Sequence, residues 1–103
     1  MVIWSEPAKD DLRQIYDYIA RGSHYYAEQT VAELIEKTEP IESFPFMGRV
    51  VPELMEENVR EILSSSYRII YEILPDLISV LAVIHTKRDF DSAFEDRRPS
   101  PVA

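Results

Sequence analysis

Residues 67–88 read YRIIYEILPDLISVLAVIHTKR, and this stretch decides the fold class. Its first eight residues are mostly aromatic and β-branched, which is typical of a strand. Pro75-Asp76 is a turn pair. The run from Leu77 to Ile84 is apolar on both faces apart from Ser79. We therefore expect two successive antiparallel strands, of which the second is central in its sheet.

Two further strands are expected earlier in the chain. Val59 to Leu63 precedes a serine turn at residues 64–66 and completes a three-stranded antiparallel meander. Val2 to Ser5 forms a short N-terminal strand. We expect both of these strands to offer exposed edges, where an extended segment of a partner adds by backbone hydrogen bonding.

Two helices separate the N-terminal strand from the meander. Ser5 and Pro7 open the first helix, and Gly22 is suited to a left-handed position at its end. Ser23 caps the second helix, which Pro40 ends or kinks. The apolar spacing predicts an inward stripe on each helix, formed by Ala8, Leu12, Ile15, Tyr16 and Ile19 and by Ala27, Val31, Leu34, Ile35 and Thr38.

The segment from residue 44 to residue 58, FPFMGRVVPELMEEN, has two prolines, one glycine and no clean period. We expect an ordered loop in which Phe44, Phe46 and Met47 pack against the core. Together these elements predict an α+β domain with an αα-hairpin packed on a single sheet. The domain spans residues 1–94, and the polar residues 95–103 form a flexible tail.

Composition excludes several classes of protein. The chain has 103 residues and no cysteine, which fits one domain without disulfides or thiolate metal sites. It has no apolar run long enough to cross a membrane, and its N-terminal residues do not resemble a signal peptide, so we expect a cytoplasmic protein. Two distant histidines predict no metal site, and we expect no cofactor. The net charge of −8 disfavours nonspecific nucleic-acid binding.

The order of landmarks resembles the RelE/ParE superfamily of bacterial and archaeal toxins over about residues 2–90. The resemblance rests on AKDDLRQIYDYIA, HYYAEQTVAELIE, FPFMGR, VREI, YRIIYEI and ISVLAVIHTKRDF, in that order. It implies a RelE-like fold and the toxic half of a type II toxin–antitoxin pair. Such a toxin is cytoplasmic and is held inactive, as a hetero-oligomer, by an antitoxin encoded next to it.

The superfamily divides by mechanism, and both branches remain open for this chain. RelE-type members cut mRNA in the ribosome, whereas ParE-type members act on DNA gyrase. The resemblance implies a phosphate or target contact in the second half, where Arg68 and Arg88 match basic positions of the family pattern. The candidate contact residues are these two with Arg60 and Lys87, the other bases on or beside the sheet, and Phe94. The candidate catalytic residues are Arg60, Arg68, Arg88 and His85.

Each candidate also has a structural reading. Arg68 is as readily paired with a sheet neighbour such as Glu61 or Glu72, and His85 fits a hydrogen-bonding role at a strand end. Lys87 and Arg88 fit a solvated strand terminus.

The nuclease reading is weakened by two departures from the family pattern. The strand VREILSSS holds a single base, where the nucleases are rich in Lys and Arg. Phe94 stands about where the nucleases place a tyrosine, and a phenyl ring stacks on a base but transfers no proton. We therefore favour a ParE-like toxin of a target such as DNA gyrase. The alternatives are a ribosome-dependent mRNA endoribonuclease using Arg60, Arg68 and Arg88, and a degenerate toxin that only binds its antitoxin.

Overall fold

The computed structural model describes residues 1–97, the side chain of Asp96 excepted. The strands and helices follow in the order β1 (Val2–Trp4), α1 (Glu6–Ala20), α2 (His24–Thr38), β2 (Arg49–Val50), β3 (Val59–Ser64), β4 (Tyr67–Ile73), β5 (Ile78–His85) and α3 (Phe90–Phe94). Short 3-10 helices occupy Glu39–Glu42, Pro45–Met47 and Glu95–Arg97.

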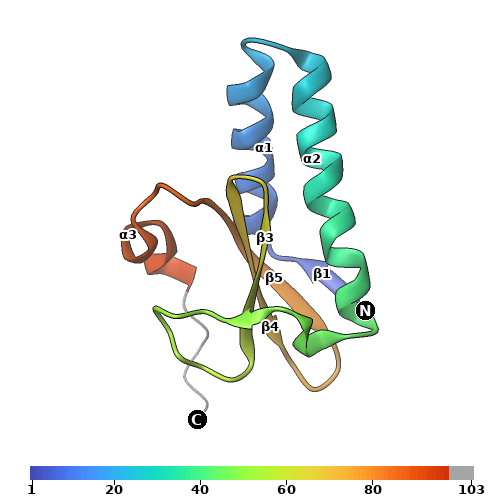
Figure 1. The fold of residues 1–103 in the computed structure, drawn as a ribbon, viewed down its shortest axis with the longest axis vertical. Coiled ribbons are helices and arrows are strands. Elements are labelled where there is room, and N and C mark those ends of the chain that lie inside the picture. The colour runs from blue at the N-terminus through green and yellow to red at the C-terminus, as the bar shows by residue number, and fades with distance from the viewer. Residues whose placement is uncertain (98–103) are drawn as a thin grey trace.

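The expected α+β architecture is confirmed. Five strands form one sheet in the order β1-β5-β4-β3-β2, in which β1 runs parallel to β5 and the other neighbours are antiparallel. β5 therefore lies between two strands, as its apolar sequence predicts. The two long helices stand side by side and project beyond the end of the sheet, whereas α3 lies to the other side of it (Figure 1).

The sheet contains one strand that the sequence does not predict. β2 lies within the expected loop and pairs antiparallel with β3, so that Arg49 lies opposite Glu61 and Val50 opposite Arg60. The expectation that Val59–Leu63 forms an exposed edge is therefore wrong at Arg60 and Glu61, which pair with β2. β1, by contrast, pairs on one side only and is an edge, as expected.

The loop before β2 is anchored through its backbone. The hydroxyl of Tyr71 donates to the Pro45 carbonyl over 2.7 Å and accepts the backbone N–H of Gly48 over 3.0 Å. A Cβ on Gly48 would lie 2.6 Å from this hydroxyl, so only glycine fits. Because the loop is held in this way, its large side chains are free to face solvent. The expected packing of Phe44, Phe46 and Met47 against the core is wrong, since all three are exposed.

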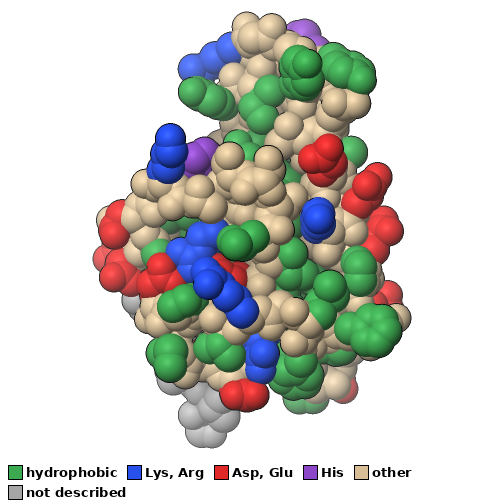
Figure 2. Space-filling model, viewed as in Figure 1, with side chains coloured by type: hydrophobic (Ala, Val, Ile, Leu, Met, Phe, Trp, Pro, Cys, Tyr) green, Lys and Arg blue, Asp and Glu red, His purple; other side chains and the backbone are tan. Residues whose placement is uncertain are grey.

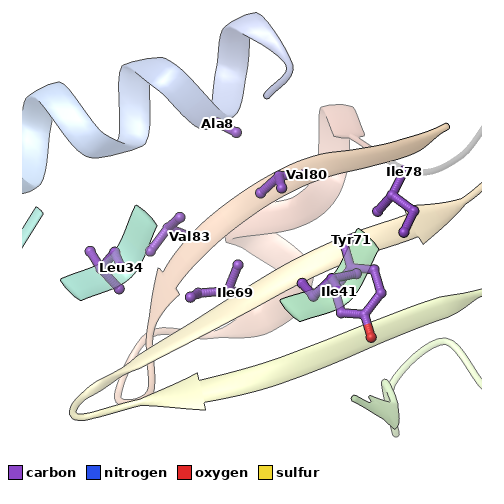
Figure 3. Close-up of a cluster of buried hydrophobic side chains, with 8 residues drawn as sticks. All are labelled: Ala8, Leu34, Ile41, Ile69, Tyr71, Ile78, Val80 and Val83. Atoms are coloured by element: carbon purple, nitrogen blue, oxygen red, sulfur yellow. The ribbon is translucent and has the colours of Figure 1, made fainter. Parts of the chain in front are cut away.

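The sheet has a buried cluster on each face. The face toward α1 and α2 is drawn in Figure 3 and buries Ala8, Leu34, Ile41, Ile69, Tyr71, Ile78, Val80 and Val83. The opposite face buries Val51, Val59, Ile70, Ala82, Ile84, Phe90 and Phe94. Alternation along β4 explains the division, because successive side chains of a strand point to opposite faces. Burial of each large apolar side chain contributes about 1.5–3 kcal/mol.

The helix starts follow the sequence, but the turn between the helices does not. Ser5 accepts the N–H of Ala8, and Ser23 accepts the N–H of Tyr26, each over 3.2 Å, as expected of N-caps. No glycine in the described part of the chain has a positive φ, so the left-handed conformation expected at Gly22 is wrong. The chain leaves α1 through a right-handed Arg21, and Gly22 donates to the Ile19 carbonyl over 3.0 Å.

Candidate functional site

Arg68 is fully committed to carboxylates within the chain. Its Nε donates to Glu61 over 2.6 Å, and its two terminal nitrogens donate to the two oxygens of Glu53 over 2.8 and 2.7 Å. Its guanidinium also lies 4.8 Å from the ring centroid of Phe90, and only 11% of the side chain is exposed. The alternative reading of Arg68, an ion pair with Glu61, is thus confirmed.

Glu61 is the counterion at the centre of this arrangement. Its side chain is fully buried, and it also accepts a hydrogen bond from Nε of Arg49 over 2.5 Å. Glu53, Glu61, Arg49 and Arg68 together form an arginine–carboxylate cluster with no net charge. Figure 2 shows basic side chains with acidic ones beside them over the sheet.

The charges in the cluster stabilise one another. The hydrogen bonds from Arg68 hold the pKa of Glu53 below its usual range. The hydrogen bond with Glu53, followed by that with Glu61, holds the pKa of Arg68 above its usual range. A phosphate group would have to displace one of these carboxylates, and breaking a buried ion pair costs about 3–5 kcal/mol. Glu53 comes from the loop after β2, so the cluster also fastens that loop to the sheet.

Arg60 lies on the other face of the sheet. It faces Tyr71 in the register of β3 and β4, and Tyr71 belongs to the cluster under the helices. Its guanidinium donates to the Glu57 carbonyl over 2.8 Å, to the Glu57 carboxylate over 2.9 Å and to the Gly48 carbonyl over 3.1 Å. Because Arg60 and Arg68 lie on opposite faces, they do not form one phosphate site.

Phe94 is a core residue. It is fully buried, and its ring stacks on Phe90 with centroids 4.9 Å apart. Its expected role in target contact is therefore wrong, because no surface of the ring is available to a base. The two phenylalanines pack α3 against the sheet, which explains an aromatic residue at this position without reference to catalysis.

The end of β5 differs from the paired arginines. His85 accepts the backbone N–H of Lys87 at Nδ1 over 3.1 Å, and its ring meets Tyr67 edge-on with centroids 5.3 Å apart. This geometry matches the hydrogen-bonding role expected at a strand end. The side chains of Lys87 and Arg88 are exposed and make no ion pair with residues 1–97.

His85 and Arg88 also line a cavity of about 390 Å³ between α1 and the ends of β4 and β5. We call this cavity the strand-end pocket, and it is lined by Asp11, Gln14, Ile15, Tyr18, Tyr67, Val83, His85 and Arg88. Burial, followed by the nearby Tyr18, raises the pKa of Tyr67, so its hydroxyl stays protonated at neutral pH. In Figure 2 a histidine and a basic side chain are seen together where the helices meet the sheet.

Asp11 lines this pocket and accepts a hydrogen bond from the part of the β5 edge that has no strand neighbour. β1 covers only residues 78–80 of β5, so the next part of that strand edge lacks a strand neighbour. The carboxylate of Asp11 accepts the backbone N–H of Val83 over 2.8 Å and pairs through both oxygens with Arg97. Arg97 belongs to the expected tail, of which residues 98–103 lie outside the described part.

Sequence reasoning missed Asp11 and Arg97. Asp11 follows Ala8 by three residues and lies on the same flank of α1, and a carboxylate beside an inward alanine was an available signal. Arg97 carried no such signal. Among the residues that the structure describes, no group of acidic and histidine side chains is placed to hold a metal ion. No helix in this part is long and apolar enough to cross a membrane.

The sequence and the fold are both similar to those of known toxin proteins. A family profile described as "ParE toxin of type II toxin-antitoxin system, parDE" matches residues 2–90. A solved structure titled "Chromosomal ParDE TA system from P. aeruginosa" is similar, with a TM-score of 0.69 and 21% identity, over 82% of this chain and 92% of the other. This similarity concerns the fold. A comparison with curated protein sequences gives no significant match.

Proposed function

The chain belongs to the ParE toxin family of type II toxin–antitoxin systems, and we propose that it inhibits growth by binding a protein target such as DNA gyrase, without catalysis of its own. We further propose that it acts in the cytoplasm and that a cognate antitoxin neutralises it in a hetero-oligomer. The domain that carries this function spans residues 1–94.

One observation carries the choice of a binding mechanism over RNA cleavage. Cleavage without a metal requires cations that are free to offset charge on the phosphate, together with a group that transfers a proton. The guanidinium groups of Arg60 and Arg68 donate hydrogen bonds to acceptors within the chain, and the two side chains lie on opposite faces of the sheet. Phe94 has no proton to transfer and is buried. Lys87 and Arg88 remain as target contacts.

β1 and the groove beside it suit docking of an antitoxin segment. The edge of β1 is open to strand addition. A shallow groove beside it is lined by Ile3, Trp4, Lys9, Leu12 and Ile35 and suits the apolar face of an amphipathic helix. Because apolar contacts dominate at these two surfaces, we expect most of the antitoxin's affinity to persist as the salt concentration is raised. A calorimetric titration in which binding collapses at moderate salt would contradict this expectation.

Induction in a bacterial host tests the proposal. We expect growth arrest, accumulation of gyrase–DNA cleavage complexes and a DNA-damage response, with translated mRNA left intact. Primer extension that finds cuts within translated codons would instead identify a ribosome-dependent endoribonuclease. Normal growth on induction would identify a degenerate toxin.

Variants connect this outcome to the structure. We expect Arg88→Gln to reduce toxicity at least tenfold, measured as the expression level needed for arrest. Lys37→Gln removes the same charge from an exposed position in the last turn of α2 and should leave toxicity unchanged. Equal toxicity of both variants would exclude Arg88 from the target contact.

A further inference from the structure

We propose that the strand-end pocket receives an acidic side chain of the antitoxin, inserted together with a neighbouring apolar side chain. This inference rests on the proposed function for the identity of the partner. The net charge of −8 alone would favour lysines and arginines on the antitoxin, whereas this pocket calls for an acidic side chain at one anchor point.

The first support is an uncompensated positive charge at the pocket. Arg49, Arg60 and Arg68 each pair with a carboxylate, whereas Lys87 and Arg88 pair with none in the described part of the chain. In a chain of net charge −8, two adjacent unpaired cations are a local exception.

The acid that shares the pocket with Arg88 and the acid that follows Arg88 in the chain already make hydrogen bonds. Asp11 is held by the Val83 N–H and by Arg97. Asp89 accepts the backbone N–H of Ser92 over 3.1 Å as the N-cap of α3, and hydrogen bonding with the side chain of Ser92, followed by this backbone N–H, lowers the pKa of Asp89. Both oxygens of Asp11 are engaged, and Asp89 is oriented toward the start of α3, so neither carboxylate forms an ion pair with Arg88 in the described part of the chain.

The second support is the set of hydrogen-bonding groups around the cavity. Tyr18, Tyr67 and Gln14 line the pocket, and neither the two hydroxyls nor the amide has a hydrogen-bond partner within residues 1–97. Ile15 and Val83 supply apolar wall between them. Arg88 offers a planar fork that binds a carboxylate through two parallel hydrogen bonds. One carboxylate with an adjoining aliphatic group matches this mixture of surfaces.

The charge distribution favours a carboxylate over a nucleic-acid backbone. Affinity for a polyphosphate comes from several Lys and Arg side chains that replace counterions along it. Here Asp11 lies in the pocket wall, and Asp10 and Asp17 lie on the same helix. An extended polyanion would be repelled by these acids, whereas a single carboxylate needs only the fork of Arg88.

The antitoxin is the occupant that fits the proposed function. An antitoxin that neutralises by covering the target surface would cover Lys87 and Arg88, the proposed target contacts. Segments that fold on binding insert a few side chains as anchors into preformed pockets. An acidic anchor would cover the target contact and remove its free charge in a single step.

Peptide probes test the pocket without a toxicity measurement. We would titrate acetyl-Leu-Glu-Leu-amide and acetyl-Leu-Gln-Leu-amide into the isotope-labelled full chain and follow backbone amide shifts. The glutamate peptide should shift Tyr18, Val83 and Arg88 saturably, and the glutamine peptide should bind at least tenfold more weakly. Arg88→Gln should abolish this preference, whereas Lys37→Gln should preserve it. Equal binding of both peptides, or displacement of the glutamate peptide by equimolar uridylyl-uridine, would overturn the proposal.

The purified cognate antitoxin tests whether the antitoxin is the occupant of the pocket. In a complex with the full chain, Arg88→Gln should weaken its binding at least tenfold, and Lys37→Gln by less than twofold. Unchanged affinity of the Arg88 variant overturns the antitoxin as occupant. Growth on induction is measured separately. If the chain is not toxic but still prefers the glutamate peptide, the proposed function has failed and the inference about the pocket has not.

Discussion

Replacement of Glu61 by glutamine tests whether the arginine–carboxylate cluster is a structural element. The fully buried carboxylate accepts hydrogen bonds from Arg68 over 2.6 Å and from Arg49 over 2.5 Å. Glutamine has nearly the same shape, but it removes the charge and turns one acceptor into a donor that faces a guanidinium. Breaking a buried ion pair in this way costs about 3–5 kcal/mol.

The lower end of this range applies here. Arg68 keeps both hydrogen bonds to Glu53, and the Arg49 side chain is 60% exposed and regains water. We therefore expect Glu61→Gln to lose about 3 kcal/mol of unfolding free energy. In a domain of this size such a loss lowers the melting temperature by roughly 12–24 °C.

Urea unfolding, followed by circular dichroism and by the fluorescence of Trp4, measures the loss. Glu57→Gln is the matched control, because Glu57 also pairs with an arginine but its side chain is 84% exposed. Exposed pairs contribute at most about 1 kcal/mol. The Glu61→Gln/Arg68→Gln double variant should recover about 2 kcal/mol of the summed single losses. If Glu61→Gln loses no more stability than Glu57→Gln, the cluster is not a structural counterion system and Arg68 returns as a candidate for target contact.

Three further changes test other parts of the structure. The folded-state pKa of Glu53 is lower than its unfolded pKa of 4.5, so its carboxylate stabilises the fold above pH 4.5 and this stability is lost as the pH falls through the folded pKa. Glu53→Gln should therefore weaken the dependence of stability on pH in acid, and urea unfolding midpoints from pH 7 downward measure this. Gly48→Ala should cost about 2 kcal/mol in urea, because its Cβ would lie 2.6 Å from two oxygens, whereas Gly22→Ala meets nothing nearer than 3.7 Å and should be neutral or stabilising. Phe94→Tyr should cost about 1–3 kcal/mol, because it buries a hydroxyl in an apolar cluster, and primer extension should find no gain of mRNA cleavage.

Sequence reasoning recovered the elements that carry a strong period. The apolar spacing located both helices and the strands of the meander, and Ala27, Leu34 and Thr38 of the predicted stripe on α2 are buried. The expected inward position of Ile35 is wrong, because this side chain is exposed. β2 was missed because its two residues, Arg49 and Val50, lie in a segment without a period. Its position depends on contacts of Gly48 with Tyr71, which lies 23 residues away in the chain. Patterns within a short window do not contain such a contact.

The candidate site was recovered only in part, for the same reason. Glu61 was foreseen as a partner of Arg68, because residues of adjacent strands in a hairpin approach each other. Glu53 was not foreseen, since it reaches Arg68 from a loop. The strand-end pocket requires the flank of α1 to lie beside the end of β5, and this packing has no local sequence signal. Lys87 and Arg88 were identified, but the cavity beside them was not.

The location of unpaired charge, rather than the number of arginines, decides what this surface can bind. At physiological ionic strength the field of an exposed charge decays over about 8 Å. The neutral cluster around Glu61 therefore presents little potential to a ligand, although it contains two arginines. Lys87 and Arg88 stand without carboxylate partners in the described part of the chain. Because these two side chains are exposed, they attract an acidic group on a protein that docks against them. The net charge of −8 still repels an extended polyanion. This distribution favours recognition of a protein surface over cleavage of RNA.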